Sequence, residues 1–546
     1  MKAFLLYSDR DFDPTLLLSR RERGLHRQQE ELERELARSL PWNHAALTRD
    51  LELNVLLNAM ARGDGYLFAA AMVGLLKGVA DPGVIAYRQE IMRDCLKSSA
   101  VVRQIYEIAI QALRDQRGRH WSIVSRYPAG TLHQSVDVLK VFVESLKQLR
   151  AVADQNIESF RSRGFSRLFA MLQAELSDDY FGLIDQHLKR LKFSGGVLVS
   201  AQLGKGNKGT NYALRRPHRE RGWLARLLRH SEGYIYHLHP RDQAGAQALG
   251  TLRDRGVNLV ANAMAQSMDH ISSFFQMLRT ELAFYVACLN LYEHLQELGA
   301  PVCFPDPTDP GRPALSFTGL YDVSLAISKN AAVVGNDLSA YGKNFIVVTG
   351  ANSGGKSTFM RGLGLAQLMM QAGMFVPASD FSAEVRSALV THYKREEDIT
   401  MESGKLDEEL RRMSEIIEHL EPGSMLLMNE SFAATNEREG SEIATQITKA
   451  LIEKGTKICY VTHLYHFAHR LHERRLPNVC FLRAERRPDR TRTFRLVEAG
   501  PLQTSYGEDR YRQAFGQEDP EKSGRSPLRG EQKPRFVPSW PRLLLI

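Results

Sequence analysis

A glycine-rich segment in the second half of the chain constrains its fold more than any other feature. Residues 350–358 read GANSGGKST, directly after the apolar run 345–348 and before a helical pattern that extends to about residue 372. Glycines let backbone N–H groups surround phosphate groups, and a helix N-terminus adds partial positive charge. The G-x-x-x-x-G-K-S spacing between a strand and a helix therefore predicts a P-loop that binds ATP.

The residues of this loop have separate predicted roles. We expect Lys356 to reach the β- and γ-phosphates of ATP, and we expect the Ser357 hydroxyl to ligate Mg²⁺. The other predicted cofactor-binding residues of the loop are Gly350, Asn352, Ser353, Gly354, Gly355 and Thr358.

A second element with the pattern of a Walker B strand follows further along the chain. The apolar run 425–428 ends in Asn429 and Glu430. Asp usually stands at the first of these positions, and Asn429 keeps an oxygen ligand for the metal but lacks the negative charge. Glu430 is predicted to orient or deprotonate the attacking water. The pair predicts ATP hydrolysis. The missing charge of Asn429 predicts weaker Mg²⁺ binding and therefore weaker hydrolysis.

The order of patterns predicts a multidomain protein, since 546 residues exceed what one hydrophobic core usually serves. Helical periodicity dominates to about residue 300, and beyond residue 313 strands alternate with helices, which predicts a largely parallel α/β sheet. The first predicted unit is a mainly α-helical region at 1–300, with a Gly-rich basic insertion at about 191–230. A Pro/Asp-rich linker at 301–312 follows, then an α/β ATPase domain at 313–516 and a basic tail of disordered composition at 517–546.

An apolar seam predicts one long helix that starts after Gly256. Its members recur at alternating steps of four and three residues: Val257, Ala261, Met264, Met268, Ile271, Phe275, Leu278, Leu282, Tyr285 and Leu289. Because only one such run is present, packing within the chain is favoured over an intermolecular coiled coil.

The basic insertion has two open interpretations. Residues 193–199 are predicted to form a short strand, and a Gly-rich turn follows it. Between Lys205 and Arg229 the chain carries eight Lys and Arg residues against the single acid Glu220. This stretch is either a surface that contacts nucleic-acid phosphates or a solvated basic loop. The formal net charge of +9 permits the first interpretation without requiring it.

Two further features bear on the compartment. The five cysteines lie far apart without a CxxC pair, which fits a reducing compartment. The N-terminus lacks the apolar core of a signal peptide, and no apolar run reaches the roughly 18 residues that span a bilayer. A cytoplasmic protein without a membrane partner is expected.

Several motifs together resemble the ATPase domain of the MutS family of DNA mismatch-repair proteins. The residues that carry the likeness are, in chain order, the segment 350–361, the segment 373–378, Ser403-Gly404-Lys405, Asn429-Glu430, the segment 435–440, Thr462-His463 and Ser505-Tyr506-Gly507. The resemblance is strong over about residues 313–516. It is weaker upstream, where Arg88-Gln89 and the seam helix resemble the family's helical core and lever.

The resemblance implies an ABC-type ATPase that engages DNA and changes state with ATP, in DNA repair or recombination. It gives His463 a catalytic role, and it implies a homodimer in which Ser403 and Gly404 complete the partner's nucleotide site. Whether mismatched, branched or plain duplex DNA is preferred stays open.

The chain also departs from the family pattern. Leu406 stands where the family has Ser, and Val333 stands where an aromatic residue stacks on adenine. No mismatch-reading Phe-x-Glu motif or N-terminal domain to carry it is apparent, so a short, divergent MutS-like protein is expected. Asn429 and Leu406 support an alternative, a nucleotide-gated scaffold protein with weak or no ATPase activity.

Overall fold

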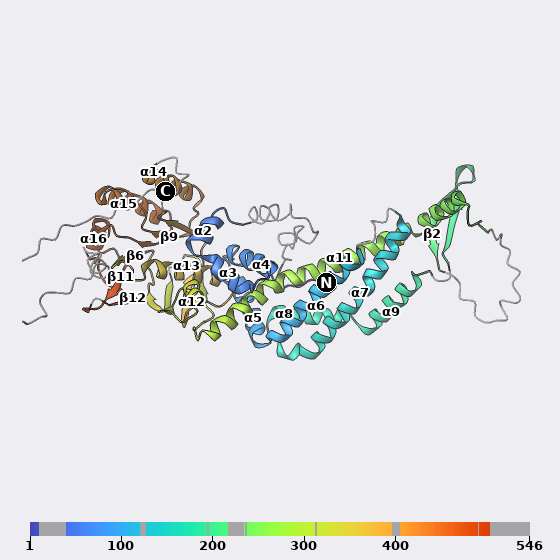
Figure 1. The fold of residues 1–546 in the computed structure, drawn as a ribbon, viewed down its shortest axis with the longest axis horizontal. Coiled ribbons are helices and arrows are strands. Elements are labelled where there is room, and N and C mark those ends of the chain that lie inside the picture. The colour runs from blue at the N-terminus through green and yellow to red at the C-terminus, as the bar shows by residue number, and fades with distance from the viewer. Residues whose placement is uncertain are drawn as a thin grey trace, which may run out of the picture.

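The chain forms an elongated molecule with an α/β part at one end and a long helical part that extends from it (Figure 1). This computed structural model describes residues 1–9, 40–120, 127–193, 196–216, 234, 237–311, 314–395, 404–489 and 491–502. Helices predominate, and the sheets of the second part mix parallel and antiparallel strands, which confirms the predicted fold class in outline. None of the helices in these ranges combines the length and the apolar character needed to cross a membrane.

The helical part consists of packed helices, several of which begin at a polar cap. Asp64, Asp81, Ser162 and Ser177 each accept a backbone N–H at a helix N-terminus. The helices are α2 (His44–Asp50), α3 (Leu53–Ala61), α4 (Gly65–Leu76), α5 (Pro82–Lys97), α6 (Ser99–His120), α7 (Pro128–Asn156), α8 (Arg163–Glu175), α9 (Asp178–Arg190) and α11 (Gln243–Glu297).

The seam helix is α11, and it packs within the chain as predicted. It contacts α7, α6, α4 and α3, and its apolar residues from Phe274 to Leu291 are buried. Its predicted start after Gly256 was wrong, because the helix begins at Gln243 with Asp242 as its cap. Gly256 lies against β1, where an added Cβ would be 2.5 Å from a Val199 methyl group. The glycine thus permits a close approach and does not end the helix.

A β-hairpin, not an irregular loop, occupies the described part of the basic insertion. Strand β1 (Leu198–Leu203) pairs antiparallel with β2 (Gly209–Arg215), and Gly206 turns the chain at a φ of 68°. The strand predicted at 193–199 therefore begins at Leu198 and extends beyond the predicted end. The hairpin lies at the far end of α11 from the α/β part (Figure 1).

The α/β part is built on a six-stranded sheet with the order β12-β11-β6-β10-β9-β8. All neighbours are parallel except β12, which is antiparallel to β11. The strands are β6 (Phe345–Gly350), β8 (Leu389–Tyr393), β9 (Met425–Asn429), β10 (Lys457–Val461), β11 (Val479–Arg486) and β12 (Arg492–Glu498). The predicted strands at 345–348 and 425–428 are confirmed.

Helices cover both faces of this sheet. Alternate β6 residues belong to different cores, with Ile346 and Val348 on the side of α13 and of the helical part. Phe345 and Val347 face the opposite core, under the other three helices. The covering helices are α13 (Lys356–Ala372), α14 (Lys405–His419), α15 (Glu437–Glu453) and α16 (Tyr465–Glu473).

A second sheet of four strands, with the order β3-β7-β4-β5, takes in the predicted linker. Strand β3 (Asp306–Thr308) pairs parallel with β7 (Asp380–Glu384). The predicted linker, 301–312, thus contains a short strand at 306–308. Its Pro and Asp content predicts a loop, but pairing with β7 supplies hydrogen-bond partners for its backbone. The other elements are β4 (Leu315–Leu320), α12 (Val323–Lys329) and β5 (Asn336–Ser339).

Buried polar contacts join the helical part to the α/β part. Arg88 is 2% exposed, and its Nε donates to the Leu6 carbonyl at 2.9 Å while Nη1 donates to the Ala372 carbonyl at 3.2 Å. The neighbouring Gln89 donates to the Pro305 carbonyl at 2.9 Å. Since Ala372 ends the helix that follows the glycine-rich loop, these bonds connect that loop mechanically to the helical part.

Candidate functional site

The glycine-rich loop connects the end of β6 to the start of α13 at the carboxyl edge of the six-stranded sheet. Its backbone requires unusual conformations, with φ of 106° at Gly350, 55° at Ser353 and 92° at Gly355. An added Cβ at Gly355 would lie 3.2 Å from the Phe494 carbonyl oxygen of β12. Glycine is therefore needed there both for the left-handed conformation and for the space.

Lys356 is held inside the loop. Its side chain is 5% exposed, and Nζ donates to the carbonyls of Gly350 and Ala351, both at 3.0 Å. The pKa of Lys356 is lowered to about 8, chiefly by burial; the negative charge of Glu430 opposes this shift and the positive charge of Arg492 adds to it. An anion that enters the loop therefore stabilises the charged form of this ammonium group.

Ser357 and Asn429 meet between the loop and β9. The Ser357 hydroxyl donates to Asn429 Oδ1 at 3.1 Å, so two neutral oxygen ligands lie side by side. Oxygen ligands are those that Mg²⁺ prefers. The donor set thus fits Mg²⁺ in type and lacks the negative charge that an Asp would add.

Glu430 and His463 form a pair at the ends of β9 and β10. His463 Nε2 lies 3.2 Å from Glu430 Oε1. The hydrogen bond from His463 and the charges of Lys394 and Lys356 hold the pKa of Glu430 below its ordinary value, although burial opposes them. Glu430 has a left-handed φ of 55°, which a non-glycine residue rarely adopts. The carboxylate is therefore ionised and aimed by a constrained turn.

Some predicted residues lie apart from this cluster or outside the described ranges. Gly404 is the N-cap of α14, which packs on β8. Ser403, the segment 505–507, the basic residues from Arg219 to Arg229 and the tail 517–546 lie outside the described residues. Asn352, Ser353, Gly354 and Thr358 all lie in the loop or in the first turn of α13.

Two β12 residues beside the loop were missed by the sequence analysis. Phe494 lines a hollow of about 470 Å³ together with Val333, Ser353 and Thr358, and its side chain is 50% exposed. Arg492 has Nε and Nη2 buried without a hydrogen-bond partner among the described residues. Sequence spacing could not reveal either residue, because β12 reaches the loop only through the antiparallel return at the sheet edge.

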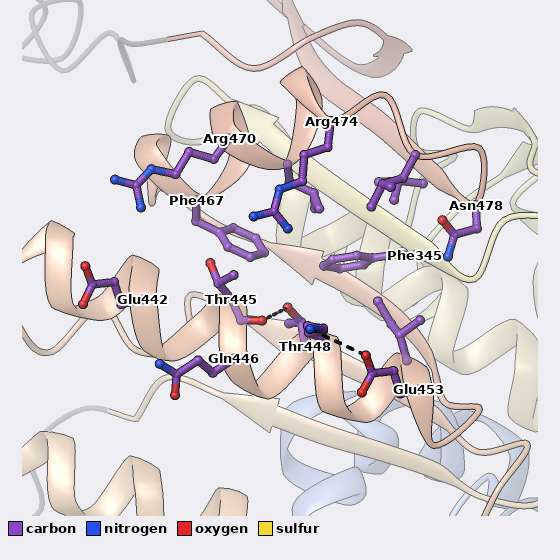
Figure 2. A pocket seen from close by; sticks show the side chains of 15 residues that line it. Phe345, Glu442, Thr445, Gln446, Thr448, Glu453, Phe467, Arg470, Arg474 and Asn478 are labelled. Carbon is purple, nitrogen blue, oxygen red and sulfur yellow. Dashed lines mark hydrogen bonds and ion pairs between the residues drawn. The ribbon is translucent and has the colours of Figure 1, made fainter.

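A separate hollow of about 300 Å³ lies between α15 and α16 (Figure 2). Phe345 and Phe467 form its apolar floor with ring centres 6.2 Å apart, and Arg470 and Arg474 stand along the α16 side. Phe345 begins β6, whereas the glycine-rich loop follows the end of the same strand. This hollow is therefore distinct from the cluster around Lys356.

Comparison with known proteins matches both parts of the chain to family models. Residues 80–298 match the MutS2 N-terminal domain, and residues 346–515 match MutS domain V.

Similar curated proteins include three that illustrate the range of the likeness. The DNA mismatch repair protein MutS of Thermotoga sp. (strain RQ2) is 35% identical over 121 residues, which is 22% of this chain and 15% of that protein. Endonuclease MutS2 of Ligilactobacillus salivarius is 31% identical over 145 residues, 26% of this chain and 18% of that protein. The human MutS protein homolog 4 is 27% identical over 151 residues, 28% of this chain and 16% of that protein. The matched segments thus span less than a quarter of each relative's length.

Proposed function

This chain belongs to the MutS family, and from that premise we propose that it is an ATP-dependent DNA-binding protein whose glycine-rich loop is the P-loop of an ABC-type ATPase. One observation carries the proposal. Lys356, the Ser357–Asn429 pair and the Glu430–His463 pair converge at the carboxyl edge of a parallel sheet, where α/β proteins bind ligands.

Each group has a role toward ATP that follows from its chemistry. The N-terminus of α13, Lys356 and the guanidinium of Arg492, whose Nε and Nη2 have no hydrogen-bond partner among the described residues, attract the phosphates. Phe494 offers an aromatic face beside Val333, where a base can stack. Ser357 and Asn429 would hold Mg²⁺, which supplies charge neutralisation of the phosphates when bound.

Glu430 is the proposed general base. Its lowered pKa keeps it ionised near neutral pH, and an ionised carboxylate can orient a water and accept its proton. His463, 3.2 Å away, holds the carboxylate in place and stabilises its charge. The uncharged Asn429 predicts weaker metal binding and slower turnover than an Asp would give.

The site is proposed to be completed by a second copy of the chain. In the MutS resemblance, Ser403 and Gly404 act on the partner's nucleotide. Gly404 begins α14, whose N-terminus carries partial positive charge and is followed by Lys405. We therefore propose a homodimer, in which each copy supplies Ser403 and Gly404 to the other copy's nucleotide.

DNA is the proposed macromolecular partner, in repair or recombination, as the MutS resemblance implies; the name of one relative, a DNA mismatch repair protein, supports it. The β1–β2 hairpin presents Lys205, Lys208, Arg215 and Arg216 at the end of the helical part. Arg215 Nε donates to the Ser200 hydroxyl at 2.8 Å, so its guanidinium is held on the hairpin while it stays exposed. These features suit phosphate contacts more than base recognition.

A nucleotide-gated scaffold protein is the second candidate function. It is favoured by Asn429 and Leu406, which depart from the family pattern at the metal and in the signature segment. It predicts nucleotide binding without turnover.

The affinity for ATP should fall as pH rises through about 8. Burial lowers the pKa of Lys356 to about 8, so the charged form that attracts phosphate is complete below this pH and is lost above it. One pH unit higher, about a tenth of the molecules keep the charge, and we expect a roughly tenfold weaker affinity at pH 9 than at pH 7. Fluorescent-nucleotide titrations across this range measure it. A Lys356→Arg variant stays charged and should show no such loss.

Replacing Arg215 and Arg216 together by Ala should weaken DNA binding independently of sequence. Each lost phosphate contact makes the log–log salt slope shallower by roughly 0.9, because fewer counterions are released. Titrations of duplex, mismatched and branched DNA at two salt concentrations measure this effect.

The matched control replaces Arg438 and Lys449 by Ala, which removes the same charge from exposed positions of α15. If the hairpin variant kept the wild-type affinity and salt slope, DNA binding would have to be assigned to another basic surface. The first to test is the cluster Arg474, Arg475, Arg486 and Arg487 of the α/β part.

A further inference from the structure

A turn held by buried side chains follows the proposed general base. Ser431 and Phe432 are both 0% exposed, and Phe432 repeats the left-handed conformation of Glu430 with a φ of 62°. Two non-glycine residues in this sparsely populated region within three positions require contacts that hold them. The position of the Glu430 carboxylate therefore depends on whatever fixes Ser431 and Phe432.

Glu409 of α14 supplies one of these contacts. Its side chain is 4% exposed, and Oε2 accepts the backbone N–H of Phe432 at 2.8 Å. A carboxylate that accepts a backbone N–H makes a strong, directional bond in a buried setting. The contact joins α14 directly to the turn after Glu430.

His392 of β8 supplies a second path between the same two elements. Its Nε2 lies 3.1 Å from the Glu409 carbonyl, and its Nδ1 lies 2.7 Å from the Ser431 hydroxyl. Burial lowers the pKa of His392 to about 3, so the ring is neutral and carries one proton. Since a carbonyl can only accept, we assign that proton to Nε2. The Ser431 hydroxyl then has two acceptors on His392 for its one proton, Nδ1 at 2.7 Å and the backbone carbonyl at 2.8 Å.

Surrounding groups leave the turn little freedom. Tyr460 donates to the Ser431 carbonyl at 2.6 Å, and the His392 ring stacks on Phe432 with centres 5.6 Å apart. An added Cβ at Gly440 would lie 2.4 Å from the Phe432 carbonyl oxygen, so α15 closes the turn from the other side. The turn is therefore packed between α14, β8, β10 and α15.

We propose that Glu409 is a positioning residue, which with His392 couples the N-terminal segment of α14 to the carboxylate of Glu430. This inference rests on the proposed function, in which Gly404 at the start of α14 acts on the partner's nucleotide. Glu409 lies five residues after Gly404, little more than one helical turn. Nucleotide in the partner's site thus influences whether Glu430 is aligned in this one.

A double-mutant cycle on Glu409 and Glu430 tests the coupling in the full chain. We expect Glu409→Ala to lower kcat roughly 10- to 100-fold, because small misplacements of a catalytic group have effects of this size. The KM for ATP should change less than about twofold, since Lys356 and the loop are untouched. In the Glu430→Gln background the same change should have no further effect, because the group that it positions is already disabled.

Two variants separate positioning from general damage. Glu409→Gln keeps an oxygen that can accept the Phe432 N–H, and it should restore most of the turnover. Glu418→Ala makes the same type of change at an exposed position of α14 and should leave kcat unchanged.

The outcomes also separate the inference from the proposed function. If the wild type hydrolyses ATP and Glu409→Ala leaves kcat unchanged, or lowers it equally in the Glu430→Gln background, the positioning role is wrong. A wild type that binds ATP without hydrolysis overturns the proposed ATPase and the positioning role with it. Hydrogen exchange at the Phe432 amide provides a readout independent of turnover, and faster exchange is expected in Glu409→Ala than in Glu418→Ala.

Discussion

Replacing Lys356 by Ala is expected to abolish tight ATP binding. This residue is the buried cation at the centre of the loop, and its ammonium is held by two backbone carbonyls at 3.0 Å until phosphate competes for it. The variant loses the charge-assisted hydrogen bonds to the phosphates, which are about twice as strong as neutral ones. We expect an affinity at least roughly 100-fold weaker, because bonds to charged groups contribute about 1.5–3 kcal/mol each. Isothermal titration with ATP measures the loss.

The matched control for this prediction is Lys454→Ala. Lys454 donates to the Ile417 carbonyl at 3.1 Å near the end of α15, and its removal should leave ATP affinity unchanged. Thermal unfolding of both variants checks that the fold is kept. An unchanged affinity in a folded Lys356→Ala variant would defeat the P-loop assignment.

Replacing Glu430 by Gln is expected to leave ATP binding intact and to slow hydrolysis by roughly 10²- to 10⁴-fold. The amide keeps the shape of the side chain and an oxygen near His463, but it cannot accept a proton from water. Single-turnover hydrolysis beside equilibrium binding separates the two effects.

Glu442→Gln is the control for this second prediction, since Glu442 is an exposed acid on α15 that lines the other hollow. Turnover in this control should match the wild type. Equal rates in Glu430→Gln and wild type would assign the base to another residue, and a wild type without hydrolysis would favour the scaffold function.

The local elements of the site could be predicted from the sequence, because each is encoded by a contiguous pattern. The helix 356–372 was predicted with both of its ends, and Lys356, Ser357, Asn429 and Glu430 follow strands that the apolar runs revealed. The resemblance to the MutS family predicted a catalytic role for His463. Its Nε2 lies 3.2 Å from Glu430 Oε1 because β9 and β10, which these residues follow, pair in parallel.

Features created by distant segments could not be predicted. Phe494 and Arg492 reach the loop only because β12 returns antiparallel to β11, and neither lies in a recognisable motif. Glu409 is one of several acids on an amphipathic helix, and only the fold selects it for the Phe432 amide. Strand β2 was not predicted, because the glycines and basic residues around it conceal the strand pattern, while backbone pairing with β1 stabilises it.

The steady-state rate of ATP hydrolysis with and without duplex DNA tests the central claim most directly. The proposed function predicts a measurable rate in the wild type, a change of that rate on addition of DNA, and its loss in Glu430→Gln. The change should shrink as salt rises, because DNA contacts through phosphates release counterions. A wild type that binds ATP but hydrolyses none of it, whether or not DNA is present, would contradict the claim.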